Sequence, residues 1–296
     1  MNTQKEQDRS LNNVKTSISS YLKVGFLTCL IVFLYFPDIT SMVSDWASKK
    51  EYSHGFLIPL ISAYIIWTKR DALRVSSIQP DVRGVFILII GVALLILGNV
   101  AFEPYTRRFS LIVTMLGLIY FLCGSKIARL LVFPVGYLIF MIPIPYIIMK
   151  TIAVNLRLIS ARVTSYTLNL AGIPIVREGV NLELPNISLE VADLCTGVLS
   201  IIAITALSVL YAYFTQRHLL SKIALVVFSI PVAIFSNMFR LMVTVGLVYA
   251  FGEKVLGSVI HQFHGTFNFL ITIILLILLG NLIRKIDLAL STVKSS

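Results

Sequence analysis

Three side chains far apart in the sequence have the types that acyl-transfer chemistry requires. Cys195 follows a short polar segment and stands just before the apolar run Val198–Phe214. The positive end of a helix dipole favours thiolate over thiol, and the thiolate is the nucleophilic form. Arg240 lies inside a second apolar run, and His261 stands near the start of a third. If the topology brings the three to one side of a membrane, they supply a nucleophile, a cation for a developing oxyanion and a base.

Each of these residues also has a purely structural interpretation. A cysteine near a helix start is often an inert small side chain, and a histidine at an interface is often merely amphipathic. Arg240 indicates function most strongly, because burying an arginine in a bilayer costs at least about 2.5 kcal/mol, although an ion pair with Asp193 would also explain it. Four polar residues near these three, or on the face expected to hold them, are expected in supporting roles: His264, Asn237, Asp193 and His54.

The composition indicates that these residues work in a membrane. Of the 296 residues, 57% are hydrophobic and only 13% are charged, which is about half the charged fraction of a soluble domain. The mean hydropathy is +0.89. Apolar runs of about 17 to 25 residues, the length that crosses a bilayer core as helix, recur along the chain. The sequence therefore predicts an all-α polytopic membrane protein.

Charge and cysteine usage exclude other classes of protein. The net charge of +11 is not taken to indicate a nucleic-acid partner, because charge imbalance in a membrane protein more often records which loops face the cytoplasm. The three cysteines are an odd number, and Cys29 and Cys123 lie inside apolar runs. We expect no disulfide scaffold. Neither a cofactor nor a metal ion is expected.

The apolar runs predict about eight transmembrane helices within a single integral membrane domain, residues 1–296. Residues 1–23 and 283–296 are expected to be cytoplasmic tails, and the first span is expected to end at Pro37 without a cleavage site. A polar segment, residues 103–108, is expected to separate spans three and four. The eight expected spans cover residues 24–36, 52–67, 84–101, 109–123, 128–142, 196–214, 223–251 and 259–282.

An extracytoplasmic substructure, residues 150–194, is expected between spans five and six. From Ile152 to Leu170, apolar residues recur at alternating steps of four and three, which predicts an amphipathic helix along the membrane surface. Residues 180–184 and 187–191 then alternate apolar and polar side chains around a Pro-Asn turn, which predicts a small β-hairpin. The hairpin leads directly into the segment that carries Cys195.

The distribution of charge predicts the orientation. With both termini in the cytoplasm, the cytoplasmic segments hold fifteen Lys and Arg against five acids, and the opposite side holds nine of each. Bases concentrate on the cytoplasmic side of membrane proteins. In this orientation Cys195, Arg240 and His261 all lie toward the extracytoplasmic face, as does His54. We expect a plasma or inner membrane protein whose active site faces outward.

Four segments in this order resemble the signature blocks of the exosortase/archaeosortase family. They are Tyr52-Ser53-His54-Gly55-Phe56-Leu57-Ile58-Pro59, Asp193-Leu194-Cys195-Thr196-Gly197, Asn237-Met238-Phe239-Arg240 and His261-Gln262-Phe263-His264-Gly265-Thr266-Phe267. The resemblance covers most of the chain, from about Tyr52 to Leu282. The family's cysteine, arginine and histidine fall on Cys195, Arg240 and His261.

The resemblance implies a membrane cysteine transpeptidase. Its partners would be secreted proteins whose C-terminal sorting signal consists of a short motif, an apolar span and a basic tail, with a membrane lipid or surface polymer as a candidate acceptor. Two departures from the family pattern are present. Asp193-Leu194-Cys195-Thr196-Gly197 replaces the more frequent Glu-Ala-Cys-Ser-Gly, and His264 stands where serine is usual. The second departure leaves open whether His261 or His264 is the main base.

Two other classes of function stay open. A transporter would use Arg240 and the histidines as a substrate or proton site, but no second charged span or internal repeat is found. A metal-dependent intramembrane protease would use Cys195, His261 and His264 as ligands, although no His-Glu-x-x-His motif is present. Sensitivity to chelators would separate the metal-dependent case.

Overall fold

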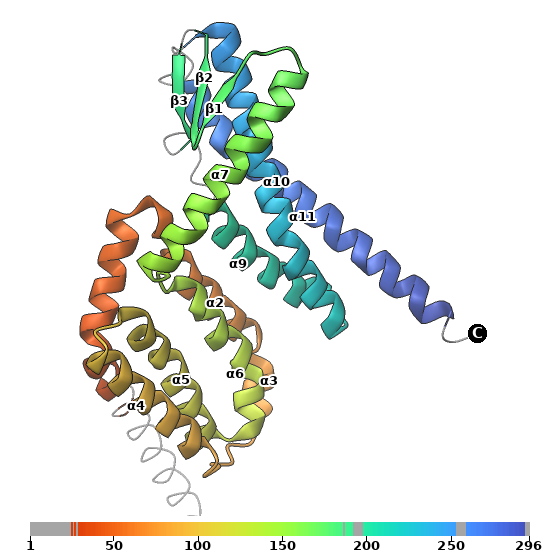
Figure 1. Ribbon diagram of the computed structural model, residues 1–296. Helices are drawn as coiled ribbons and strands as arrows, with labels where there is room; N and C mark the ends of the chain where they lie inside the picture. Colours follow the sequence, from red (N-terminus) through yellow and green to blue (C-terminus); the bar gives the residue numbers. More distant parts are fainter. Residues whose placement is uncertain are drawn as a thin grey trace, which may run out of the picture. The chain divides into compact units, whose positions relative to one another are not determined.

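The computed structural model describes residues 25, 27, 29–185, 187–191, 198–252 and 259–293. Within these ranges, the side chains of residues 50, 51, 198–200, 259–266 and 290–293 are not described. The chain divides into two compact units, Met1–Pro143 and Ile144–Ser296. Helices dominate both units (Figure 1). Each unit is described by itself, so a single domain over residues 1–296 stays a prediction.

The first unit consists of helices joined by short connections. It begins with the helix Cys29–Ser48. The elements after it, in chain order, are η1 (Lys50–Phe56, a 3-10 helix), α2 (Leu57–Thr68), α3 (Arg70–Val75), α4 (Gly84–Val100), α5 (Pro104–Cys123), α6 (Ser125–Tyr137) and η2 (Leu138–Met141, a 3-10 helix).

Small residues let α4 and α5 approach closely. Gly84, Gly91 and Gly98 recur every seventh residue on α4 and are buried. A Cβ added at Gly91 would lie 2.5 Å from Thr114 Oγ1, and one at Gly98 would lie 2.7 Å from the backbone nitrogen of Arg107. Such spacings leave no room for a side chain, so the two helices pack backbone to backbone, as glycine seams do in membrane helices.

The first helix continues beyond Pro37, where the sequence predicted its end. It runs to Ser48, because proline removes only one amide from the helical ladder, and membrane helices tolerate that loss. Tertiary contacts stabilise the added turns: Arg107 of α5 forms an ion pair with Asp38 at 2.9 Å, and Arg108 forms one with Asp45 at 2.8 Å. The predicted boundary at Pro37 was therefore wrong.

The segment 103–108, predicted as a loop between two spans, is mostly helix. Glu103 caps α5 by accepting hydrogen bonds from the backbone amides of Tyr105 and Thr106, and Pro104 occupies the first helical turn. Although burial by itself raises the pKa of Glu103, hydrogen bonds from Thr106 and Tyr105 hold it below the ordinary value. Arg107 and Arg108, predicted to lie in the loop, are inside the helix, where their ion pairs with Asp38 and Asp45 offset the cost of burying charge.

The second unit holds a small antiparallel sheet and four long helices. Its elements are α7 (Tyr146–Leu170), β1 (Val176–Glu178), β2 (Asn181–Leu184), β3 (Ile187–Glu190), α9 (Val198–Thr215), α10 (Leu219–Phe251) and α11 (Val259–Val293). The strand order is β1-β2-β3, and Leu182 of β2 pairs with Leu189 of β3. The sheet differs from the predicted two-stranded hairpin by its third strand, β1, which pairs with β2.

Two buried clusters hold this unit together. One joins the sheet to α7 and the C-terminal half of α10 through Ala161, Ile175, Leu182, Leu184, Leu189, Val191, Leu241, Val245 and Val248. The other joins α9, α10 and α11 through Ala212, Leu225 and Leu276. α11 extends to Val293, past the predicted end of span eight at Leu282, and the hydroxyl of Ser221 on α10 donates a 2.6 Å hydrogen bond to Asp287 on this extension.

The face that α7 buries is not the one predicted from its apolar stripe. Small side chains are buried on α7, namely Ser160, Ala161, Thr164 and Ser165. The predicted apolar stripe is largely exposed, with Tyr166 68% and Leu170 73% accessible. An exposed apolar stripe on an amphipathic helix is what a membrane interface would cover, so a location along the membrane surface stays our expectation.

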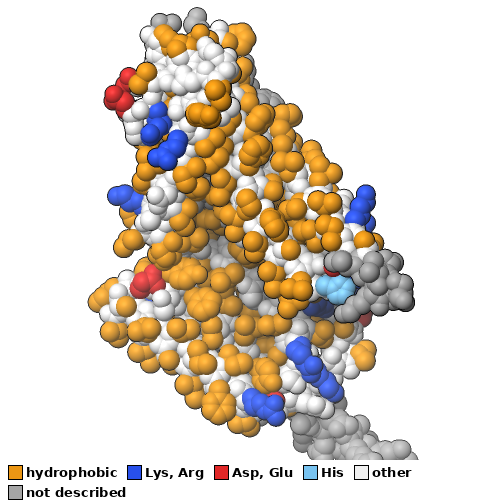
Figure 2. Space-filling view, turned by 45° about the vertical axis from the view of Figure 1, so that its right-hand side comes forward, with side chains coloured by type: hydrophobic (Ala, Val, Ile, Leu, Met, Phe, Trp, Pro, Cys, Tyr) orange, Lys and Arg blue, Asp and Glu red, His pale blue; other side chains and the backbone are white. Residues whose placement is uncertain are grey.

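The protein is a helical, polytopic membrane protein. Among the described residues, four helices are long and apolar enough to cross a membrane, or five if Ser125–Met141 and Tyr146–Leu170 count as one broken span. Gly84–Val100 and Ile201–Thr215 are shorter apolar helices. Figure 2 shows hydrophobic side chains over most of the face in view, with charged ones mostly along its margins. The number of eight spans stays a prediction.

Candidate functional site

The structure describes the predicted site residues to different degrees. Arg240 and Asn237 lie on α10, and His54 lies on η1 in the first unit. The backbones of His261 and His264 belong to the first turns of α11, but their side chains are outside the described set. Cys195 and Asp193 fall outside the described residues altogether. The predicted constellation is therefore not tested as a whole.

A polar stripe runs along one side of α10 through the predicted arginine. Ser236 is 3% and Asn237 is 5% exposed, Arg240 is half-buried, and Thr244 is 6% exposed. Spacings of three and four place these residues on adjacent turns of one helix face. The Thr244 hydroxyl donates a 2.9 Å hydrogen bond to the Arg240 carbonyl. The stripe therefore places several hydrogen-bonding groups in the turns of α10 on either side of Arg240.

A buried hydrogen-bond cluster joins this stripe to α11. The Ser236 hydroxyl donates to Asn268 Oδ1 at 3.1 Å and also contacts the hydroxyl of Thr272, which donates to the Asn268 carbonyl at 2.8 Å. Asn268 is 6% and Thr272 is 2% exposed. Leaving such groups unsatisfied in an apolar interior costs about 1–3 kcal/mol each, so the cluster specifies how the two helices pair.

This pairing sets the heights of the site residues along the two helices. α10 and α11 run antiparallel, since Ser236 lies opposite Asn268 and Thr272, and Ser221 lies opposite Asp287. Arg240 stands one turn beyond Ser236, and His264 stands one turn before Asn268. The α10 turn with Arg240 is thus near the level of the His264 backbone, while His261 is about 4.5 Å further along α11.

The small sheet positions the chain that leads to Cys195. Val191, directly after β3, is fully buried and belongs to the same cluster as Leu241, the residue after Arg240. The backbone amide of Val191 donates to the Val180 carbonyl, which anchors this end of the sheet. Cys195 comes four residues later in the sequence. The described part of the chain therefore brings the start of the cysteine segment to the arginine-bearing part of α10.

His54 lies in a tight turn that a tryptophan covers. The segment predicted as the start of span two is the 3-10 helix η1, which precedes α2. A Cβ on Gly55 would overlap the indole of Trp46, so glycine is required at that position. Trp46 Nε1 donates a 2.9 Å hydrogen bond to the Met141 carbonyl, which ties the helix Cys29–Ser48 to η2. The first unit thus holds the His54 turn rigidly.

The polar stripe has partners that were not predicted from the sequence. Ser236, Asn268 and Thr272 were not singled out, although Asn268 follows His264 by one helical turn. The available signal was a polar residue in an apolar span at the i+4 position from a candidate histidine. Among the described residues, no group of three His, Cys, Asp or Glu could hold a metal ion. This leaves the expectation of no metal untested, because Cys195 and the side chains of the two histidines are outside that set.

The fold and the polar stripe on α10 define the class of protein: it is a polytopic helical membrane protein that buries polar side chains between its helices. A family model described as transmembrane exosortase (Exosortase_EpsH) matches residues 46–278. The chain therefore belongs to the transmembrane exosortase family, which supports a sorting enzyme of the exosortase type. No curated protein and no solved structure matches the chain.

Proposed function

We propose that the protein is a thiol-dependent sorting enzyme that cleaves secreted proteins at a C-terminal signal and transfers them to an acceptor. The observation that carries this proposal is the family match over residues 46–278, a range that includes all seven candidate site residues. The signal would consist of a short motif, an apolar span and a basic tail. The acceptor would be a membrane lipid or a surface polymer.

The proposed reaction proceeds in two acyl transfers. The Cys195 thiolate attacks the carbonyl of the scissile peptide, and Arg240 stabilises the thiolate and then the oxyanion. His261 protonates the leaving amine, and the tetrahedral intermediate collapses to a thioester on Cys195. His261 then removes a proton from the acceptor, whose attack on the thioester forms the new bond and releases the thiolate. Nothing further is consumed.

The surroundings of Arg240 support its proposed role. Its turn is fixed by the buried Ser236–Asn268–Thr272 cluster on one side and by the Leu241 packing on the other. Fixed charges stabilise a transition state better than mobile ones, because they need no reorganisation during the reaction. Asn237 lies one helical turn before Arg240, on the same face of α10. We assign Asn237 the role of orienting Arg240, with Asp193 and His54 as further supporting residues.

The two histidines have different claims to the acid–base role. The family motif assigns it to His261, whereas the antiparallel pairing of α10 and α11 brings the backbone of His264 closer to the level of Arg240. His261→Gln and His264→Gln variants separate the two. The variant that loses sorting while its amount in the membrane stays unchanged identifies the main base.

The central experiment is co-expression with a secreted reporter that carries a motif, an apolar span and a basic tail. Processing is scored by gel shift for the wild type and for Cys195→Ala, with Cys29→Ala as a matched control, because Cys29 is an exposed free thiol in the first unit. We expect processing to be lost in Cys195→Ala and retained in Cys29→Ala. Processing that survives Cys195→Ala, or that chelators abolish, would instead favour the metal-dependent protease.

The active site is expected to face outward, with both termini in the cytoplasm. Both tails can be tested with a membrane-impermeant thiol reagent on single cysteines placed at residues 5 and 294 in a background without other cysteines. Protection of both positions in intact cells, and labelling after the membrane is opened, is the expected result. Labelling of either tail in intact cells contradicts the orientation.

A further inference from the structure

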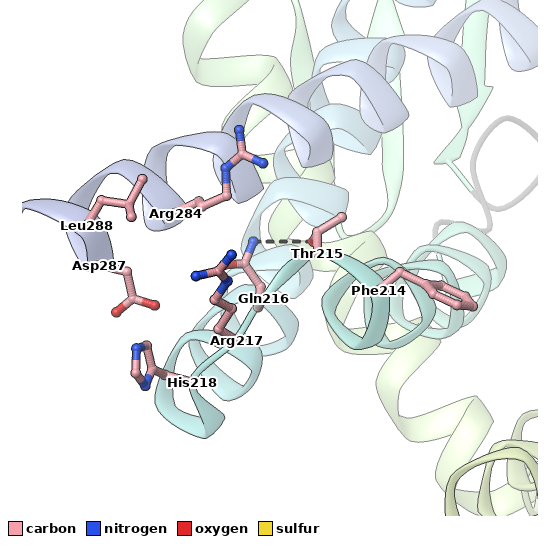
Figure 3. A pocket seen from close by; sticks show the side chains of 8 residues that line it. All are labelled: Phe214, Thr215, Gln216, Arg217, His218, Arg284, Asp287 and Leu288. Atoms are coloured by element: carbon pink, nitrogen blue, oxygen red, sulfur yellow. Dashed lines mark hydrogen bonds between the residues drawn. The ribbon is translucent and has the colours of Figure 1, made fainter. Parts of the chain in front are cut away.

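A cavity opens where α9 ends and α10 begins, and α11 forms its other wall (Figure 3). Its volume is about 590 Å³. It lies about 33 Å along α10 from Arg240, since α10 rises about 1.5 Å per residue, so it is separate from the candidate active site. We call it the turn pocket; its lining residues are Phe214, Thr215, Gln216, Arg217, His218, Arg284, Asp287 and Leu288.

The turn pocket carries an excess of positive charge. Arg217 and Arg284 contribute two guanidinium groups, and Asp287 contributes one carboxylate. That carboxylate accepts a 2.6 Å hydrogen bond from the Ser221 hydroxyl. Among the described residues, no carboxylate lies within ion-pair distance of Arg217 or Arg284. Figure 3 shows Arg284 on α11 and Arg217 on the connection after α9, both among the residues that line the pocket. The pocket therefore favours an anion.

The N-terminus of α10 adds to this preference. α10 begins directly after His218, a lining residue whose side chain makes no capping hydrogen bond. The first amides of a helix lack intrahelical partners and carry the positive end of the helix dipole. An anion at this end would accept hydrogen bonds that the protein itself does not provide. The arginines and the helix terminus are independent features that select the same ligand charge.

A buried amide oxygen adds a second requirement. Gln216 is 4% exposed, and its Nε2 donates a 3.0 Å hydrogen bond to the Gly280 carbonyl on α11. Because the Gly280 carbonyl can only accept a hydrogen bond, the Gln216 amide atom that faces it must be the nitrogen. The remaining amide atom of Gln216 is therefore Oε1. The described residues provide no donor for Gln216 Oε1, although it is buried. Because Oε1 has almost no accessible surface, a ligand hydrogen-bond donor meets it only when the Gln216 amide turns toward the pocket.

Apolar side chains border the polar groups. Phe214 and Leu288 line the pocket, and Leu219 and Leu220 follow it at the start of α10; all four are more than half exposed. A soluble anion gains nothing from such a surface, whereas acyl chains bury it. The pocket lies at the ends of three apolar helices, α9, α10 and α11, next to a basic connection. In a membrane protein, this sequence pattern indicates the boundary between the bilayer and water. Basic pockets between membrane helices on the cytoplasmic side bind anionic lipid headgroups.

We propose that the turn pocket binds an anionic membrane phospholipid whose headgroup bears a hydroxyl, of the phosphatidylglycerol type. The phosphodiester lies between Arg217 and Arg284 at the N-terminus of α10. The headgroup hydroxyl donates to Gln216 Oε1, and the acyl chains cover Phe214 and Leu288. Bound in this way, the lipid links the α9–α10 connection to α11 and stabilises the folded protein by mass action. The inference does not depend on the proposed function.

The test measures thermal unfolding of the full-length protein in detergent as lipid is titrated. The probes are phosphatidylglycerol, phosphatidic acid, phosphatidylcholine, glycerol phosphate and inorganic phosphate. We expect phosphatidylglycerol to raise the unfolding temperature at the lowest concentration, and the two soluble anions to have no effect at the same concentrations. The Arg217→Gln/Arg284→Gln variant should weaken the apparent affinity by roughly 30-fold, because each basic residue near a lipid surface contributes about a factor of five.

Two controls make the result specific. Arg83→Gln/Arg129→Gln removes the same charge from exposed arginines of the first unit and should leave the lipid effect unchanged. Gln216→Met should bind phosphatidylglycerol and phosphatidic acid equally, because it removes the acceptor for the hydroxyl. A response to inorganic phosphate alone shows a free-anion site and overturns the lipid assignment. A response to phosphatidylcholine equal to that to phosphatidylglycerol shows non-specific adsorption, as does an equal loss of the lipid effect in the two double-arginine variants. Either result overturns the proposal that the turn pocket binds the lipid.

Discussion

Replacing Leu241 with alanine tests whether packing beside Arg240 supports the site. Leu241 is fully buried, and its cluster contains four other side chains with no exposure, Ala161, Leu182, Val191 and Val245. Because Leu241 is enclosed on all sides, its neighbours cannot fill the space that alanine would leave. We therefore expect the substitution to lower the free energy of unfolding by about 2–5 kcal/mol. For a unit of this size, that corresponds to a fall of about 4–20 °C in unfolding temperature. Thermal unfolding in detergent measures it.

The informative comparison is with Leu276→Ala. Leu276 is 1% exposed and lies in the separate cluster with Ala212 and Leu225. Both substitutions should lower the unfolding temperature to a similar extent. Sorting of the reporter per folded molecule should fall only in Leu241→Ala, because Leu241 belongs to the same buried cluster as Val191, which precedes the Cys195 segment. If Leu276→Ala lowers sorting as much, or if Leu241→Ala leaves it unchanged, the packing at Leu241 does not support the site.

Three further perturbations probe the first unit. Arg107→Met leaves the Asp38 carboxylate, which is 6% exposed, without its ion pair. We expect the free energy of unfolding to fall by about 3–5 kcal/mol and to recover in part when Asp38→Asn is added. An Arg107→Met variant as stable as the wild type contradicts this. Because the pKa of Glu103 is lowered on folding, its charge stabilises the protein above its ordinary pKa of 4.5 and loses that effect as pH falls through the lowered value. The difference in unfolding temperature between the wild type and Glu103→Gln should therefore shrink on acidification, and a difference that grows would refute the assignment. Gly91→Leu places side-chain atoms where a Cβ alone would be 2.5 Å from Thr114 Oγ1, so it should reduce the amount of folded protein in the membrane, while Gly136→Leu, where a Cβ meets nothing within 4 Å, should not.

The helical membrane class could be predicted from the sequence because it depends on composition and on the length of apolar runs. Element boundaries could not, where distant residues decide them. Asp38 and Arg107 are far apart in the sequence, but they form an ion pair in the fold. This pairing lets each charged side chain lie within a helix, at positions where the sequence predicted loops. The seven-residue glycine spacing on α4 was present in the sequence, but its meaning depends on what lies opposite, which is α5.

For the candidate site, the sequence by itself determined which residues could react. A thiol, a guanidinium and imidazoles in or beside apolar runs are recognisable from residue type, and their motifs led to the family that the match over residues 46–278 shows. Their common role stays a prediction, since Cys195 and the histidine side chains are outside the described part of the chain.

Only the tertiary structure decided what surrounds Arg240. The pairing of Ser236 with Asn268 and Thr272 sets the relative heights of α10 and α11, and the clustering of Val191 with Leu241 attaches the sheet to the same turn. The physical reason is that hydropathy reports whether a segment is apolar, but not which face of a helix meets which neighbour. In a chain whose helices are apolar on most of their surface, side-chain packing and a few buried hydrogen bonds determine that choice.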